Sequence, residues 1–106
     1  MNFENILFDQ KGSIATVTIN RPKALNALNQ QTLEDLLQCF TSIAGDVSVQ
    51  VVIVTGSGEK AFVAGADITN MQSLDPIAGK AFGNLGHEVM DAVATVPQPV
   101  IAAVNG

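Results

Sequence analysis

The chain has 106 residues, of which 47% are hydrophobic and 14% charged, and ten acidic against five basic residues give a formal charge of −5. A chain of this length fits one domain with a real core, and so apolar a composition excludes intrinsic disorder. The negative charge has the wrong sign for a general nucleic-acid surface or an anionic-membrane surface.

The cysteine count and the N-terminal residues bear on the cellular compartment. Cys39 is the one cysteine, so no internal disulfide forms, and "MNFENILF" lacks the basic and long apolar regions of a secretory signal. No apolar run reaches the ~18 residues needed to span a bilayer. We therefore expect a soluble protein of a reducing, cytoplasmic compartment.

The first third of the chain predicts a β-hairpin. Residues 6–10 and 14–20 are rich in β-branched and aromatic types, and Lys11-Gly12 between them is a turn signal. In "IATVTIN" apolar residues alternate with threonines, which indicates a strand with one buried face.

An amphipathic helix is expected next. Asn29 is a good N-cap for a helix that begins at Gln30, and Gly45 is a plausible end. The apolar residues between them recur at helical spacing: Leu33, Leu36, Leu37, Phe40, Ile43 and Ala44. Cys39 lies beside this apolar stripe with no basic neighbour in sequence, so we expect an inert, buried thiol.

The second half continues an α/β pattern. "VQVVIVTG" predicts a strand buried on both faces, and "GSGEK" predicts a strand-to-strand turn that leads into "AFVAG", expected to be a brief strand. Asp75-Pro76 is typical of a helix start, and we expect this helix to run to about Val96.

The residues 100–104 predict another apolar strand, with no element after it. A bare strand of this kind is prone to association, so we expect residues 1–106 to be the N-terminal portion of a single, longer domain.

Several common catalytic signatures are absent from the sequence. "TGSGEK" fails as a phosphate-binding loop because Glu59 separates Gly58 from Lys60, and Ala61 replaces the required hydroxyl. His87 has no second histidine, cysteine or carboxylate pair at metal-ligand spacing, so a structural or solvated histidine is favoured and no metal site is expected.

The stretch "KAFVAGADI" is different, because its small side chains let another molecule approach the main chain. A turn there can aim backbone N–H groups at a developing negative oxygen, which is a large term in acyl chemistry. A glycine flanked by alanines is also a common packing device, so the pattern by itself leaves both readings open.

Three blocks together decide between these readings. "TINRPKALNALN", "KAFVAGADI" and "PQPVIAAVNG" occur in an order and spacing that resembles the enoyl-CoA hydratase/isomerase, or crotonase, family. The resemblance implies a truncated crotonase-like (ClpP/crotonase) α/β fold, a spiral of β-β-α units that binds an acyl-CoA thioester. It covers only the N-terminal part of that domain.

The resemblance also implies roles for individual residues. Ala66 would donate its backbone N–H to the thioester oxygen, and the helix after Asp75 would border the acyl chain. Asp67 could equally be a helix cap. The implied contacts to coenzyme A or the pocket wall are Lys23, near phosphate, then Ala24, Leu25, Ala64, Ala66, Asp67 and Ile68.

The family's second oxyanion donor and its two catalytic glutamates lie beyond these three blocks. We therefore expect an enoyl-CoA hydratase whose first 106 residues alone are inactive; an isomerase or another superfamily reaction is the alternative within the class. Thr69 stands where many relatives carry a basic residue, which puts an outer phosphate contact in doubt.

The resemblance implies no cofactor, since coenzyme A is part of the substrate, and an assembly of trimers or hexamers. A second hypothesis, from another class, is a non-catalytic short form that acts as a binding or assembly module.

Overall fold

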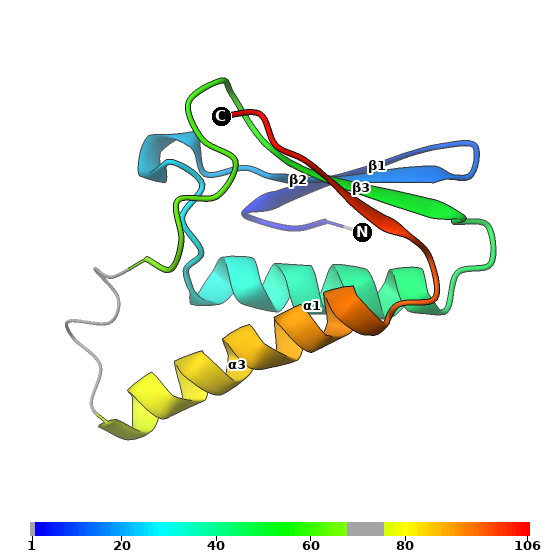
Figure 1. Ribbon diagram of the computed structural model, residues 1–106. Coiled ribbons are helices and arrows are strands. Elements are labelled where there is room, and N and C mark those ends of the chain that lie inside the picture. The colour runs from blue at the N-terminus through cyan, green and yellow to red at the C-terminus, as the bar shows by residue number, and fades with distance from the viewer. Residues whose placement is uncertain (1, 68–75) are drawn as a thin grey trace.

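The computed structural model describes residues 2–67 and 76–106. It contains a four-stranded sheet of order β1-β2-β3-β4, with two long helices lying together beneath one face (Figure 1). β1 and β2 are antiparallel, whereas β2, β3 and β4 are parallel to one another. Within the described ranges, no helix is long and apolar enough to cross a membrane.

The predicted hairpin is confirmed. β1 (Ile6–Lys11) and β2 (Ile14–Ile19) pair through a two-residue turn in which Gly12 has φ 61°, a value that favours glycine. The alternate residues Ala15, Val17 and Ile19 are at most 1% exposed. One face of β2 therefore forms the floor of the core.

The predicted first helix is also confirmed, as α1 (Gln30–Ala44). The Asn29 side chain accepts a hydrogen bond from the Thr32 N–H at 2.9 Å, and the helix ends at Gly45. Cys39 is completely buried, and this burial raises the pKa of its thiol to about 12. The expected inert thiol is thus what the structure contains.

The central strand is β3 (Val51–Gly56), and the prediction that it is buried on both faces is wrong. Val52 is fully buried, but Ile53, Val54 and Thr55 are only partly buried. The reason is visible in Figure 1, where α1 and α3 cover the same face of the sheet.

The last helix and strand lie close to their expected positions. α3 (Pro76–Thr95) packs beside α1, with Phe82 and Val89 in the core, and β4 (Val100–Ala103) pairs with β3 at the edge of the sheet. The predicted capping role of Asp75 lies outside the described residues.

The predicted strand at "AFVAG", and with it the strand-to-strand turn at "GSGEK", is wrong. Residues 57–67 form an irregular loop whose one strand-like feature is an isolated bridge between Leu28 and Ala66. Gly65, with φ 110°, interrupts the extended backbone. The segment pairs with the loop after β2 instead of with the sheet.

Candidate active site

The candidate site lies where two loops leave the same edge of the sheet. Because β2 and β3 are parallel and end in register at Ile19 and Gly56, their carboxyl ends are adjacent. The first loop (residues 20–29) and the second loop (residues 57–67) both start there. In sheets of this kind, ligands bind outside the carboxyl ends of the strands.

The two loops are joined by the buried side chain of Asn26, which is 1% exposed. Its amide donates to the carbonyls of Ser57 and Ala61 at 3.0 and 2.9 Å, and its oxygen accepts from the Arg21 N–H at 2.9 Å. Its φ of 58° is one that asparagine tolerates. Nothing larger than glycine fits at Gly56 beneath this joint, because a Cβ there would lie 2.7 Å from the Ala61 carbonyl oxygen.

Main-chain hydrogen bonds then align the second loop with the first. Leu25 accepts from the Ala64 N–H at 3.1 Å, while Leu28 donates to Gly65 at 2.8 Å and accepts from Asp67 at 2.9 Å. Because Leu28 bonds to the residues on both sides of Ala66, as in a parallel bridge, the N–H of Ala66 itself faces away from Leu28. Among the described residues it has no hydrogen-bond acceptor.

Ala66 is exposed and lines a hollow of about 380 Å³ between the loops and the two helices. The residues around this hollow are Leu28, Leu33, Ala66, Phe82, Gly83, Gly86, His87 and Met90. Nearly all of them are apolar, so Ala66 borders a surface from which water is easily displaced. Within the described ranges, no group of three or more His, Cys, Asp or Glu is placed to hold a metal ion.

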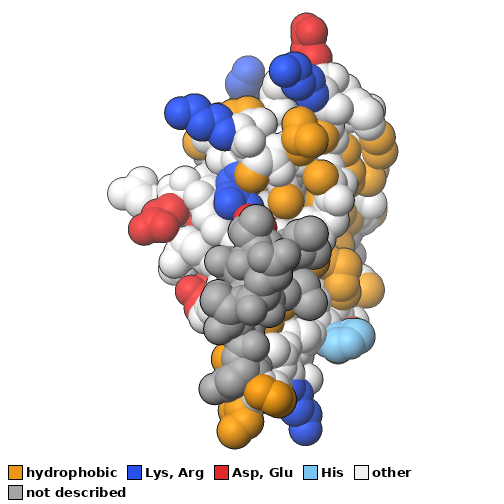
Figure 2. All heavy atoms as spheres, turned by 90° about the vertical axis from the view of Figure 1, so that its left-hand side faces the viewer, with side chains coloured by type: hydrophobic (Ala, Val, Ile, Leu, Met, Phe, Trp, Pro, Cys, Tyr) orange, Lys and Arg blue, Asp and Glu red, His pale blue; other side chains and the backbone are white. Residues whose placement is uncertain are grey.

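The residues predicted to contact coenzyme A lie beside the same joint. Lys23 and Ala24 belong to a short 3-10 helix, η1 (Pro22–Ala24), and Leu25 follows it with φ 53°. Lys23 and Leu25 line a second hollow, of about 500 Å³, together with Lys60 from the second loop. Figure 2 shows that the Lys and Arg side chains of this face lie mainly at its upper end.

The structure brings most of the predicted site residues together. Leu25 and Ala64 are directly hydrogen-bonded, and Ala66 follows two residues later. Lys23 lies on the neighbouring hollow and not on that of Ala66. Ile68 lies outside the described residues.

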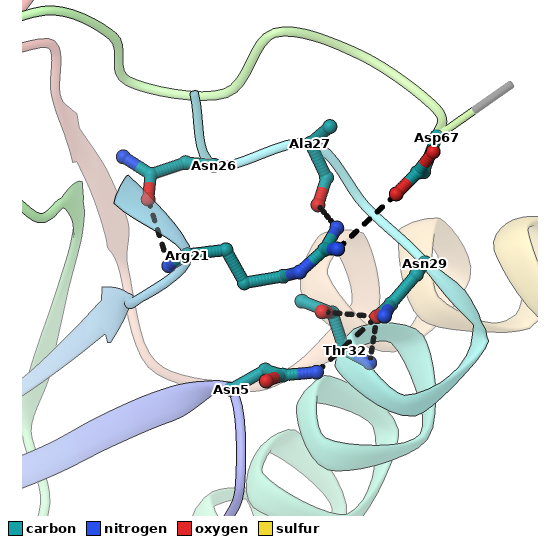
Figure 3. A network of polar contacts seen from close by, with 7 residues as sticks. All are labelled: Asn5, Arg21, Asn26, Ala27, Asn29, Thr32 and Asp67. Atoms are coloured by element: carbon teal, nitrogen blue, oxygen red, sulfur yellow. Dashed lines mark hydrogen bonds and ion pairs between the residues drawn. The ribbon is translucent and has the colours of Figure 1, made fainter. Parts of the chain in front are cut away.

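An ion pair that the sequence did not predict completes the joint. The Arg21 Nη2 atom lies 3.1 Å from Asp67 Oδ2, and its Nη1 atom donates to the Ala27 carbonyl (Figure 3). Asp67, expected to form a pocket wall or a helix cap, thus holds its carboxylate against the first loop. Arg21 and Asp67 are 46 residues apart, and no periodic pattern signals such a pair.

The parallel strands, the helices on one face and the paired loops define an α/β protein with its candidate site at the carboxyl edge of the sheet. The family model described as enoyl-CoA hydratase/isomerase matches residues 9–106, and the chain belongs to this family.

Relatives with assigned names support this membership. The chain is 49% identical to a short-chain-enoyl-CoA hydratase of Clostridium acetobutylicum and 46% identical to a crotonyl-CoA hydratase of Syntrophomonas wolfei. Each match covers all of this chain and 41% of the relative. The chain therefore spans well under half the length of these relatives.

Solved structures agree on the fold. An enoyl-CoA hydratase from Bacillus anthracis superposes with a TM-score of 0.94 at 36% identity, over 97% of this chain and 40% of its own. An enoyl-CoA hydratase/carnithine racemase from Magnetospirillum magneticum gives 0.93 at 41% identity, over 99% of this chain and 40% of its own. The predicted crotonase-like fold is confirmed.

Proposed function

We propose that these residues are the N-terminal portion of an enoyl-CoA hydratase, an enzyme that adds water across the α,β double bond of an acyl-CoA thioester. The observation that carries the proposal is made at Ala66, whose N–H has no acceptor among the described residues and which lines an apolar hollow. The names of the relatives agree with it.

The chemistry explains why a main-chain donor is useful. Hydroxide from water bonds to the β carbon, and the electrons of the double bond move onto the thioester oxygen to form an enolate, which is then protonated at the α carbon. An N–H dipole held next to that oxygen stabilises the enolate more than the neutral carbonyl, so it lowers the barrier. The side chain of residue 66 only has to leave room.

The proposed substrate contacts follow the paired loops. The Ala64 carbonyl and residues 23–25 hold coenzyme A, with the Lys23 ammonium near a phosphate, while Asp67 and Ile68 belong to the wall of the acyl site. Coenzyme A enters as part of the substrate, so the reaction uses no separate cofactor. We assign the enzyme to the cytoplasm and to an oligomer of trimeric symmetry.

The proposal includes a division of labour along the chain. His87 is the one titratable residue among those that line the Ala66 hollow within the described ranges, and a single imidazole is not the acid–base pair that hydration requires. We propose that residues beyond this chain provide the second donor and the proton transfers, and that the 106 residues alone do not turn over substrate.

The test uses the complete gene product that contains this chain, assayed for hydration of crotonyl-CoA. Ala66→Pro removes the N–H, and Gly65 tolerates the following proline because it has no Cβ to clash with the ring. We expect kcat to fall by about 10²–10³-fold with substrate binding retained, whereas Ala66→Ser, which keeps the amide, stays near wild type.

Two outcomes reject the proposal: absence of hydration by the wild-type gene product, or equal activity of the proline and serine variants. Analysis of the product separates hydration from isomerisation, since a proton shift between the α and γ carbons yields no hydroxyacyl thioester.

A second candidate function is that of a non-catalytic assembly module. It is favoured by the exposure of Ile101 and Val104, at 54% and 67%, and by an apolar groove of about 750 Å³ that reaches Val100 and Ala102. Sedimentation of the 106-residue chain with and without a full-length relative discriminates. Co-sedimentation without turnover supports the module, and a stable monomer with no affinity for acyl-CoA rejects it.

A further inference from the structure

The main-chain bonds that orient the Ala66 amide are few. Leu28 holds the residues on either side of Ala66, through the Gly65 carbonyl at 2.8 Å and the Asp67 N–H at 2.9 Å. This is an isolated bridge and not part of a strand. An isolated bridge has no adjacent residue pairs of a strand ladder to support it, so the orientation of the Ala66 amide depends on additional contacts.

The Arg21 side chain makes such a contact, because its guanidinium joins the two loops. One nitrogen donates to the Ala27 carbonyl in the first loop, and the other lies 3.1 Å from the Asp67 carboxylate in the second (Figure 3). The side chains of Arg21 and Asp67 are only 19% and 14% exposed. Water therefore screens this charged pair less than it screens a surface pair.

The backbone of Arg21 is itself firmly held. Its N–H donates to the Asn26 side chain at 2.9 Å, and its carbonyl accepts from the N–H groups of Ala24 and Asn26 at 3.0 and 2.8 Å. It also follows β2 by two residues. The guanidinium thus extends from a backbone anchored just beyond the end of β2 to the residue that follows Ala66.

We infer that Arg21 is a positioning residue, which fixes the direction of the Ala66 amide by holding Asp67; the inference rests on the proposed function. The planar fork of a guanidinium provides two N–H groups at the separation that the Ala27 carbonyl and the Asp67 carboxylate require. A lysine ammonium is a single point charge and cannot serve both partners in the same geometry. Arg21→Lys therefore keeps the charge and loses the clamp.

The expected kinetic effect is selective. A misplacement of about 1 Å in a reacting group can cost on the order of 10²-fold in rate, so Arg21→Lys should lower kcat by roughly 10–100-fold. KM should change by less than about threefold, because the proposed coenzyme A contacts at residues 23–25 and at the Ala64 carbonyl do not involve this pair, and Arg21→Lys leaves the Asp67 side chain in the acyl wall unchanged. Since Arg21 acts through Asp67, Arg21→Lys combined with Asp67→Asn should be no worse than the poorer single variant.

The experiment measures two quantities on the complete gene product: kcat for crotonyl-CoA per acyl-CoA binding site, and hydrogen exchange of peptides that cover residues 61–67. Ile43→Val is the matched control, since Ile43 is 1% exposed in the core at the far end of α1. The inference expects Arg21→Lys to speed exchange in 61–67 and to lower kcat, and expects the control to do neither.

Two results would overturn the inference. One is unchanged exchange in residues 61–67 of Arg21→Lys. The other is faster exchange with an unchanged kcat per site, which would make the ion pair merely structural. An inactive wild-type gene product instead rejects the proposed function, and the inference with it, so the two failures are distinguishable.

Discussion

Replacing Asn26 by alanine should be among the most damaging single changes in the chain. The substitution removes the acceptor of the Arg21 N–H and the donor of the Ser57 and Ala61 carbonyls. The Ala61 carbonyl keeps a hydrogen bond from Asn105 at 3.2 Å, so two backbone groups lose the partner described here. Alanine must also adopt the φ of 58° that asparagine tolerates.

These losses give a magnitude. Leaving a buried backbone group without a hydrogen bond costs about 1–3 kcal/mol. The two groups here are only partly buried and water reaches the loops in part, so we take about 1–1.5 kcal/mol for each. A left-handed conformation costs alanine a further 1–2 kcal/mol or so. We therefore expect Asn26→Ala to lower the free energy of unfolding by about 3–5 kcal/mol, a large share of the ~5–15 kcal/mol typical of a domain.

The assay is urea unfolding of the complete gene product, followed by circular dichroism at a fixed protein concentration. Asn26→Gly is the informative companion: it loses the same hydrogen bonds but adopts the positive φ freely, so it should cost about 1 kcal/mol less than the alanine variant. Asn84→Ala, an exposed change on α3, should lie within about 0.5 kcal/mol of wild type.

The reasoning is refuted if Asn26→Ala costs less than about 1 kcal/mol, a loss too small for two orphaned backbone groups. A glycine variant less stable than the alanine variant would refute the conformational part alone.

Three further predictions concern other residues. The pKa of Cys39 is about 12 in the folded protein against an ordinary 9.0, so the free energy of unfolding should be constant below pH 9 with respect to this group and should decline between pH 9 and 12. A thiol reagent at pH 8 should label Cys39 only after unfolding. Gly56→Ala should destabilise by about 1–3 kcal/mol in urea, because the new methyl group meets main-chain carbonyl oxygens of the second loop. Gly45→Ala should be nearly neutral, because its methyl group meets only the Ser42 carbonyl oxygen, at 4.0 Å, an ordinary contact distance. Hydrogen bonds from Ser48 lower the pKa of Asp46 below its ordinary 3.8. The ionised Asp46 therefore stabilises the fold above pH 3.8, and this contribution is lost as the pH falls further. Asp46→Asn should make the free energy of unfolding less dependent on pH in acid.

Local pattern was sufficient for the hairpin and for α1. Alternation in β2 and the N-cap at Asn29 are each visible within a few consecutive residues, and both predictions are confirmed. The degree to which β3 is buried could not be predicted from local pattern. A run of β-branched residues has the same sequence pattern whether helices cover one face of a sheet or both.

The second loop shows a different limit. "AFVAG" has the composition of a strand, but composition does not reveal a partner, and the actual partner is the irregular loop after β2. Asn26 and the pair Arg21–Asp67 were missed for a related reason. Their contacts connect residues distant in sequence, and a single asparagine between apolar neighbours gives no periodic signal.

The motif around Ala66 was found in sequence because several small residues stand together, and the structure leaves its amide without an acceptor among the described residues. The roles of Lys23, Ala24, Leu25 and Ala64 stay predictions. A main-chain donor has no characteristic side chain, so its use in catalysis has to be tested by removing the N–H itself.

The order of the elements along the chain has a consequence for the synthesis of this protein. Both loops of the joint precede α3, so every residue that bonds residues 21–28 to residues 57–67 leaves the ribosome before α3 does. Asn105, which ties the same loop to the end of β4, is synthesised after α3. The residues that orient the amide of residue 66 are thus available before the helix that lines its hollow.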